Sequence, residues 1–361
     1  MAIDEVESYP MIAGDGPSSY AKNSSYQKAL VEAARELINK NIANKLDLCS
    51  LKFDTDSCAF RIADLGCSVG PNTFIAVQTI IEAVELKYHA EHQNTSALEF
   101  QVLFNDHTDN DFNTLFRTLP PRKYFAAGVP GSFHGCLFPK STLHVVHSST
   151  ALQWLSRVPK ELINEKASES KRRNIQYTGS AKEVVEAKSA QFRNDMESFL
   201  NARAEELVSG GLMLISFPAM PDGTPVIDTI IGSILNFIGS CLIEMARMGM
   251  INEEKAYNFV VPMYTPTPKE MESIIQRNGY FTIETMCEMK NPMSHRTYSA
   301  EFNISHIRAA MEGLVLKHFG DDSVDKIFNY FTAKLADNPS VFDTKLKNMD
   351  LFICLRRIST D

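Results

Sequence analysis

One stretch of the chain decides the fold, and it reads Ile62-Ala63-Asp64-Leu65-Gly66-Cys67-Ser68-Val69-Gly70-Pro71-Asn72. The apolar run over residues 59–65 that leads into it predicts a buried strand. Gly66 and Gly70 bracket a tight turn, and Pro71 suits the first position of a helix, where its missing N–H costs nothing. A strand, a glycine turn and a helix N-terminus together predict a cradle for a nucleotide-like ligand, because free backbone N–H groups point outward there.

Three interpretations of this stretch are open. Asp64-x-Gly66-x-x-x-Gly70 matches the first motif of S-adenosylmethionine (SAM)-dependent methyltransferases. Gly66-x-Ser68-x-Gly70 matches the nucleophile elbow of α/β-hydrolases. The third interpretation is a tight turn that binds no ligand. Short motifs of this kind also occur by chance, so the rest of the chain has to decide.

The composition bounds the class of protein. The chain has 361 residues, 44% hydrophobic and 22% charged, which is enough for one large α/β domain or two domains. Its net charge of −8 argues against binding to nucleic acid or to an anionic membrane. Seven scattered cysteines without a C-x-x-C pair predict reduced thiols in a cytoplasmic protein. Residues 1–16 lack a secretory core, and Asp228 and Asn236 interrupt the apolar stretch 226–243, so no signal peptide or membrane span is expected.

Apolar runs and helical periodicities alternate along the chain. Strands are expected at 59–65, 99–106, 124–131, 142–149, 210–217, 280–286 and 351–356. Helices are expected near 18–37, 74–84, 159–163, 181–207, 226–248, 269–277, 304–318 and 322–337. This alternation predicts an α/β fold, a Rossmann-like doubly wound, mostly parallel seven-stranded sheet. We expect one domain over residues 1–361, with a helical cap from about 151–178, 220–262 and 290–320, and with residues 14–30 closing the site.

Asp106 ends the second expected strand, 40 residues after Gly66, where a dinucleotide fold places its ribose-binding acid after about 20. A carboxylate at this strand end can accept hydrogen bonds from ribose hydroxyls. The spacing leaves a second possibility open, in which Asp106 caps a helix that begins near Asp109-Asn110-Asp111-Phe112.

Motifs over nearly the whole chain resemble those of the plant SABATH methyltransferases. They are Ser19-Tyr20, Asn23-Ser24-x-x-Gln27, Ala63-Asp64-Leu65-Gly66-Cys67-Ser68-x-Gly70-Pro71-Asn72, Phe104-Asn105-Asp106, Asn110-Asp111-Phe112-Asn113, Gly128-Val129-Pro130-Gly131-Ser132-Phe133, Leu137-Phe138-Pro139, Ser148-Ser149, Trp154-Leu155-Ser156, Gly210-Gly211, Pro262-x-Tyr264-x-Pro266 and His318-Phe319-Gly320. Members of this family transfer a methyl group from SAM to the carboxylate of a small acid, such as salicylate, jasmonate, loganate or farnesoate. One branch, the caffeine-synthase type, methylates a xanthine nitrogen instead.

The resemblance implies a role for each matching position. The residues implied to bind SAM are Tyr20, Ser24, Asp64, Gly66, Cys67, Asn72, Asp106, His107, Ser132 and Phe133. Among them Asp106 would bind the ribose, while Ser132 and Phe133 would hold the adenine. The residues implied to bind the substrate are Gln27, Thr150, Gln153, Trp154, Leu235 and Tyr264. Gln27 and Trp154 would hydrogen-bond its carboxylate. Without the resemblance, Trp154 and Phe133 are core residues and Gln27 is an exposed helix residue.

The chain departs from the family pattern at several positions. Thr150 stands where a tyrosine is usual, and Gln153 where salicylate-type members carry Met and xanthine or iridoid-acid members carry His. Leu235 aligns near a second tryptophan of salicylate-type members, and His134-Gly135-Cys136 replaces the commoner Tyr-Gly-Arg. Positions that bind metal in some members fall near residues that are poor magnesium ligands, so we expect no metal; these are Lys171, Tyr257 and Val260.

The sequence therefore predicts a SAM-dependent carboxyl O-methyltransferase that forms the methyl ester of a small plant acid, with S-adenosylhomocysteine (SAH) as the second product. A sulfonium is already an electrophile and a carboxylate is already ionised, so no acid, base or metal is needed. The alternatives are a xanthine-type N-methyltransferase, a cofactor-binding protein without turnover, and an α/β-hydrolase, although residues 1–60 lack the glycine cluster of an oxyanion hole. We expect a cytoplasmic homodimer that binds neither nucleic acid nor membrane.

Overall fold

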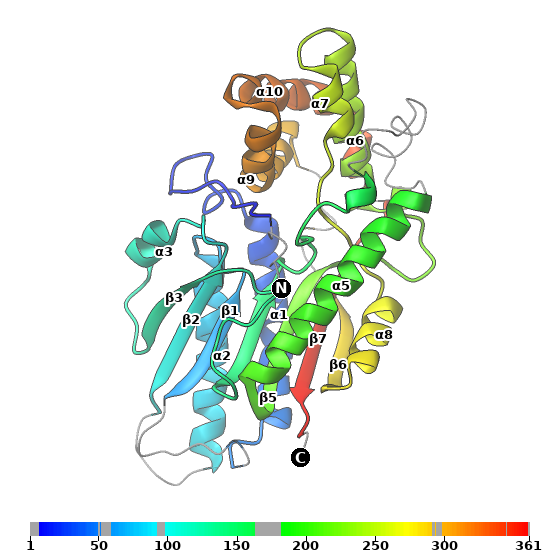
Figure 1. Cartoon of the computed structure of the whole chain (residues 1–361). Helices are drawn as coiled ribbons and strands as arrows, with labels where there is room; N and C mark the ends of the chain where they lie inside the picture. Colours follow the sequence, from blue (N-terminus) through cyan, green and yellow to red (C-terminus); the bar gives the residue numbers. More distant parts are fainter. Residues whose placement is uncertain are drawn as a thin grey trace.

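The centre of the protein is a seven-stranded sheet in the order β3-β2-β1-β4-β5-β7-β6 (Figure 1). The computed structural model describes residues 7–49, 51, 59–91, 98–162, 182–290, 293, 298–343 and 345–359. The strands are β1 (Phe60–Leu65), β2 (Phe100–Asp106), β3 (Phe125–Pro130), β4 (Leu143–Ser149), β5 (Leu207–Ala219), β6 (Phe281–Met289) and β7 (Met349–Arg357). Strands β1 to β5 pair in parallel, whereas β7 is antiparallel to both β5 and β6. The prediction of a mostly parallel, Rossmann-like sheet is confirmed.

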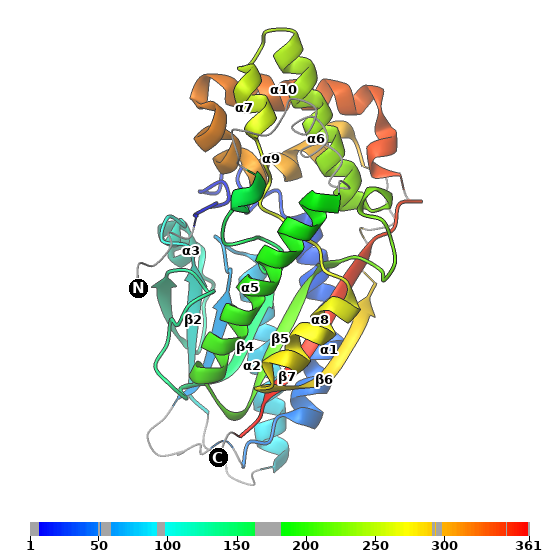
Figure 2. The same ribbon diagram turned by 45° about the vertical axis from the view of Figure 1, so that its right-hand side comes forward.

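Helices cover both faces of this sheet and the end where its parallel strands finish (Figures 1 and 2). They are α1 (Ser25–Lys45), α2 (Asn72–Glu91), α3 (Phe112–Thr118), α5 (Lys182–Glu206), α6 (Ile230–Arg247), α7 (Glu253–Asn258), α8 (Pro268–Asn278), α9 (Ala300–Phe319) and α10 (Asp321–Asp337). Short 3₁₀ turns lie at η1 (Lys160–Leu162), η2 (Val226–Asp228) and η4 (Pro339–Phe342). The helix expected at 159–163 is reduced to the single turn η1, and residue 163 lies outside the described residues.

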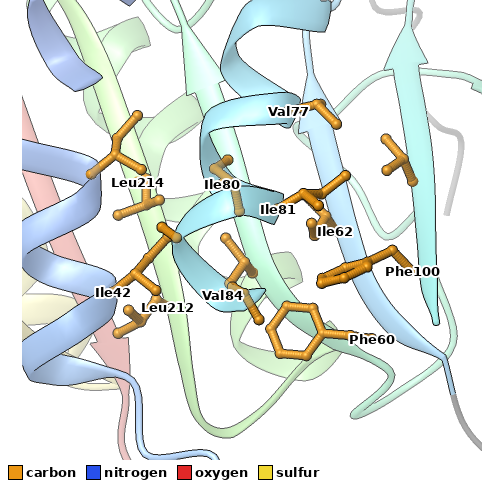
Figure 3. Close-up of a cluster of buried hydrophobic side chains, with 14 of the residues drawn as sticks. Ile42, Phe60, Ile62, Val77, Ile80, Ile81, Val84, Phe100, Leu212 and Leu214 are labelled. Carbon is orange, nitrogen blue, oxygen red and sulfur yellow. The ribbon is translucent and has the colours of Figure 1, made fainter. Parts of the chain in front are cut away.

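The core follows the two-residue alternation of buried parallel strands. Ile62 and Leu214 face α1 and α2, where they pack with Ile42 and Ile80 (Figure 3). The neighbouring residues of the same strands, such as Ala63, point to the opposite face, which α5 and α8 cover (Figure 2). Because both faces are buried, the strands read as continuous apolar runs, which is why the sequence predicts them well.

Helices α6, α7, α9 and α10 form a separate layer at the end of the sheet where the parallel strands finish (Figure 1). Their apolar faces share one cluster, in which Leu242 of α6 packs with Val315 of α9 and Phe331 of α10. The cap ranges expected from the sequence leave out α10, which packs in this layer, and they include residues 163–178, which lie outside the described part. Helix α6 is long and apolar enough to cross a membrane, yet its buried face packs inside the cap.

The segment before α1 runs between the sheet and the cap. The backbone N–H of Ile12 donates to the carbonyl of Ala309 in α9, and that of Tyr20 donates to the carbonyl of Ile12. The first helix begins at Ser25 and not near residue 18, because polar side chains there bond the local backbone; Asn23 Nδ2, for example, donates to the carbonyl of Pro17 at 2.7 Å.

Candidate active site

A cavity of about 180 Å³ lies between the carboxyl ends of the strands and the cap. A smaller space of about 20 Å³ adjoins it beside the glycine turn. Five residues line both spaces, so the two form one cleft; they are Tyr20, Gln27, Gly66, Ser68 and Thr150. The carboxyl edge of a parallel sheet is where α/β proteins usually bind ligands.

Most of the residues predicted from the sequence meet in this cleft. Those that line it are Tyr20, Gln27, Asp64, Gly66, Cys67, Asn72, Asp106, His107, Phe133, Thr150, Gln153 and Trp154. Ser24 does not line the cleft but contacts the lining residue Asn72: its hydroxyl accepts a 3.0 Å hydrogen bond from Nδ2 of Asn72. Ser132 also stands outside the lining, and its Oγ accepts from the backbone N–H of His134.

Two predicted substrate residues do not line the cleft. Tyr264 lies between Met263 and Thr265, which both line the cavity, so in an extended segment its side chain points the other way. Its ring packs on Phe192, and its hydroxyl donates to Oε2 of Glu270 at 2.8 Å. Leu235, one helical turn beyond the lining residue Ile231, packs against the cap cluster. Neither residue is among those that line the cleft, and their role in substrate binding stays a prediction.

The glycine turn has little room for any other residue. Gly66 has a φ of +80°, and a Cβ added there would lie 2.3 Å from the Cβ of Ala151. The backbone N–H groups of Gly66 and Cys67 both donate to the carbonyl of Asn105 at the end of β2, at 2.9 and 3.0 Å. Burial raises the pKa of the Cys67 thiol well above its usual range, so this cysteine lines the cleft as a neutral group.

Asp106 is held at the end of β2 by two backbone donors. Its Oδ2 accepts from the N–H of Ser68 and its Oδ1 from the N–H of His107, both at 2.7 Å. Burial raises the pKa of Asp106, an effect that these hydrogen bonds partly offset. The alternative in which Asp106 caps a helix is wrong, because Asp111 is the N-cap of α3 and accepts from the N–H of Thr114.

Asp64 has partners that the sequence analysis missed. The hydroxyl of Thr73 in α2 donates to its Oδ2, and Nδ1 of His147 in β4 lies 2.6 Å from its Oδ1. Asp64 and His147 are almost fully buried and both line the small space beside the glycine turn. His147 stands in an apolar strand pattern, and no signal within β4 links it to a carboxylate 83 positions earlier.

A buried ion pair holds the loop that carries Ser132 and Phe133. Arg203 Nε donates to Oε2 of Glu206 at 2.7 Å, while its two terminal nitrogens donate to the carbonyls of Phe133 and Gly135. Glu206 Oε1 accepts from the N–H of Phe138 at 3.0 Å. Both charged residues are fully buried. The sequence did contain a signal for this pair: Arg203 and Glu206 are charged residues on the apolar face of the helix expected at 181–207, and charged residues are rarely buried unless they are paired.

Gln27 and Trp154 reach the same cavity from distant parts of the chain. Gln27 lies in the first turn of α1, and its Oε1 is buried with no hydrogen-bond partner among the described residues. Trp154 follows β4, forms a β-bridge with Met263 and packs against the cap cluster. The Trp154 ring therefore has the packing of a core residue and also lines the cavity.

The lining of the cleft fits SAM, since it combines a glycine cradle with a half-buried carboxylate at a strand end. The described part of the chain contains no group of three or more His, Cys, Asp and Glu side chains that could hold a metal. Of the positions compared with metal sites, Lys171 lies outside that part.

The fold and the cleft define an α/β enzyme of the SAM-dependent methyltransferase class. The model of the SAM-dependent carboxyl methyltransferase family matches residues 6–358, and this chain belongs to that family. The resemblance to the plant SABATH enzymes is thereby confirmed, and the α/β-hydrolase interpretation of Gly66-x-Ser68-x-Gly70 is excluded.

Three relatives show where the chain lies within the family. Loganic acid O-methyltransferase of Catharanthus roseus is 43% identical over 355 residues, covering 98% of this chain and 95% of the relative. Farnesoic acid carboxyl-O-methyltransferase of Arabidopsis thaliana is 45% identical over 352 residues, covering 97% and 99%. Caffeine synthase 1 of Camellia taliensis is more distant, at 32% identity with 96% of each chain covered. A solved loganic acid methyltransferase with SAH superposes with a TM-score of 0.92 at 43% identity, covering 97% of this chain and 99% of the other.

Proposed function

We propose that this enzyme converts a small plant carboxylic acid to its methyl ester, with Gln27 and Trp154 positioning the carboxylate. The observation that carries the proposal is the meeting of these two side chains in one cavity with the glycine turn. Nε2 of Gln27 and the indole N–H of Trp154 are hydrogen-bond donors, and the two oxygens of a carboxylate are acceptors.

The neutral hydrogen-bond donors in the cleft suit a carboxylate as the nucleophile. Among the described lining residues there is no Lys or Arg. Neutral donors orient an anion without pairing its charge, so the oxygen keeps its nucleophilicity. SAM, when bound, supplies the methyl group as a sulfonium, and no proton has to move.

The chain's own work is then to position the carboxylate and to exclude water. Tyr20 lies 9% exposed over the glycine turn, and the segment that carries it is held to α9 through Ile12. Positioning of two reactants in a dry site can lower the barrier by about 7–11 kcal/mol.

The test is a radiolabelled methyl-transfer screen over benzoic, nicotinic, indole-3-acetic, jasmonic, terpenoid and iridoid acids, with xanthines included. We expect a base-labile methyl ester from at least one acid. Label only in xanthines, in a base-stable product, would favour the N-methyltransferase alternative. Calorimetric binding of SAH without turnover on any compound would indicate a protein that has kept the cofactor and lost the reaction.

We further propose that the enzyme is a cytoplasmic homodimer. Free thiols support a reducing compartment, and they include Cys67, Cys241 and Cys354 in the core. Phe125 on the edge strand β3 is 62% exposed, which is apolar surface that a second copy would cover. Light scattering that gives the 40.4 kDa mass of a single chain would exclude the dimer.

A further inference from the structure

The first turn of α1 carries Gln27, yet its own N-cap residue does not satisfy its backbone. A helix begins with N–H groups that have no partner within the helix, and the N-cap side chain usually accepts from one of them. Ser24 makes no such bond, because its hydroxyl accepts from Asn72 instead, and the first turn contains no acidic residue. Five other helices do have a side chain that accepts at the N-cap: Asp111, Thr229, Asn252, Thr267 and Ser299.

The acceptor for α1 comes from the helical cap, 281 positions later in the chain. The backbone N–H of Ser25, the first residue of α1, donates to Nε2 of His306 in α9 at 3.3 Å. Helix α9 lies above the start of α1 in Figure 1, and its Ala310 lines the same cavity as Gln27. His306 therefore joins the helical cap to the turn that carries Gln27.

The ring of His306 is held in the tautomer that accepts this bond. Its Nδ1 lies 2.9 Å from the carbonyl of Phe302. A carbonyl oxygen only accepts, so the proton is on Nδ1 and the lone pair of Nε2 faces Ser25. Burial lowers the pKa of His306, which keeps the ring neutral at neutral pH. The ring also packs on that of Phe302, with 4.3 Å between centroids, and Phe302 stacks on Tyr298.

The position of Gln27 depends on the backbone of this turn. Within the described part of the chain, no hydrogen bond reaches its Oε1. The preceding residue, Tyr26, is tied to the sheet, because its hydroxyl donates to Oδ1 of Asp350 in β7 at 2.6 Å. His306 supplies the second tie, from the opposite side. Helix ends fray, and a first turn that loses the bond from His306 spends more time in conformations that move Gln27 away.

We propose that His306 is a positioning residue for methyl transfer: by accepting from the N-terminus of α1, it holds Gln27 against the substrate carboxylate. This role rests on the carboxyl methyl transfer and on the role of Gln27 proposed above. His306 is not among the residues that line the cavity, so it acts through α1 and not by contact with the acid.

Two variants with side chains of similar length separate the acceptor from the packing. His306→Gln keeps an acceptor, an amide oxygen near the position of Nε2, whereas His306→Met has no comparable acceptor. The assay uses radiolabelled SAM and the acid with the highest kcat/KM in the screen described above. We expect His306→Met to lower kcat/KM about 5–30-fold, which corresponds to about 1–2 kcal/mol for a lost helix N-cap. We expect His306→Gln to stay within about threefold of the wild type.

His318→Met is the matched control. It makes the same substitution in the same helix, but Nε2 of His318 bonds the carbonyl of Lys255 within the helical cap, at 2.8 Å. We expect this variant to stay within about threefold of the wild type in kcat/KM. Calorimetric SAH binding shows that each variant is folded. His306→Leu, a second variant without an acceptor, replaces His306→Met if the latter does not fold.

A double-mutant cycle with Gln27→Ala shows whether His306 acts through Gln27. In the Gln27→Ala background, His306→Met should lower kcat/KM by less than about threefold, because the group that it positions is already absent. A histidine that only stabilises the fold would cost the same in both backgrounds. Hydrogen exchange gives a readout without activity: the amides of residues 24–28 should exchange about 5–30-fold faster in His306→Met than in the wild type or in His306→Gln.

Three results would overturn the proposal: unchanged kcat/KM in His306→Met, an equal loss in His306→Gln, or the same loss with and without Gln27. Failure of the proposed function is a different result. If the wild type methylates no acid, carboxyl methyl transfer falls together with the part of His306 in it, and hydrogen exchange still shows whether His306 holds the start of α1. If acids are methylated and the exchange of residues 24–28 does not change in His306→Met, only the role of His306 falls.

Discussion

The backbone N–H of Ser68 donates a 2.7 Å hydrogen bond to Oδ2 of Asp106, which lies 38 positions later in the chain. This bond joins the glycine turn after β1 to the end of β2. It also fixes the carboxylate of Asp106, a residue that lines the larger cavity. The same turn leaves the Ser68 hydroxyl buried, without a hydrogen-bond partner in the described part of the chain.

Asp106→Asn is expected to weaken SAH binding about tenfold or more at pH 7.5, since charge-assisted hydrogen bonds are worth about 1.5–3 kcal/mol each. Burial raises the pKa of Asp106, so the carboxylate takes up its proton at a higher pH than an ordinary aspartate. The affinity of the wild type for SAH should therefore fall as the pH drops into the acidic range. The affinity of Asp106→Asn should depend less on pH. Calorimetry from pH 4.5 to 8 measures this, with the exposed Asp109→Asn as a control. If SAH affinity depends on pH in the same way in wild type and Asp106→Asn, Asp106 has a structural role and does not bind the cofactor.

Ser68→Ala should change kcat/KM for methyl transfer by no more than about twofold to threefold, which corresponds to about 0.5 kcal/mol. Within the described part of the chain, hydrogen bonds reach only its backbone: the N–H donates to Asp106, and the carbonyl accepts from Asn110 Nδ2 at 3.1 Å. The check is a methyl-transfer assay beside an esterase assay. An esterase activity present in the wild type and lost in Ser68→Ala would show a nucleophilic serine.

Gly66→Ala should destabilise the protein by about 2–5 kcal/mol. The left-handed backbone costs about 1–2 kcal/mol for a residue with a Cβ, and the collision with Ala151 adds an overpacking term of about 1–3 kcal/mol. Gly223→Ala is the matched control, because Gly223 has a φ of +73° and open space around it. Urea unfolding of both variants separates the two contributions. If both variants lose the same free energy of unfolding, Ala151 moves aside at little cost.

Gln27→Ala and Trp154→Phe should each lower kcat/KM about 10²-fold, because either loss lets the carboxylate turn away from the methyl group. The double variant should lose less than the product of the two, since residues that act as a unit are non-additive. Trp154→Phe keeps most of the apolar volume packed against the cap, which isolates the effect of the indole N–H. SAH affinity serves as the control for folding.

Additive losses in that cycle would show that the two side chains do not share one carboxylate. Losses in kcat/KM that are matched by weaker SAH binding would move both residues to the cofactor side of the cleft. In either case the proposed methyl transfer to a carboxylate would no longer be supported by the meeting of Gln27 and Trp154 in one cavity.

The sequence by itself determined the elements whose signals are local. The buried strands read as apolar runs because both faces of the sheet are covered, and the turn around Gly66 reads from the glycines that its left-handed backbone and the nearby Ala151 require. Asp106 was placed correctly at a strand end for the same reason, because the end of an apolar run is visible within a few residues.

Tertiary structure alone decided which side chains meet. Asp64 faces His147, and Arg203 holds the loop after β3, because of the order of strands in the sheet and the path of α5 across it. Tyr264 turns away from the cleft because its extended segment presents Met263 and Thr265 instead. The amide nitrogen of Gln153 donates to the carbonyl of Thr150, a contact that depends on how the chain turns after β4. Periodicity and turn chemistry act over a few residues, whereas these contacts depend on the free energy of packing whole elements against one another, which no local pattern encodes.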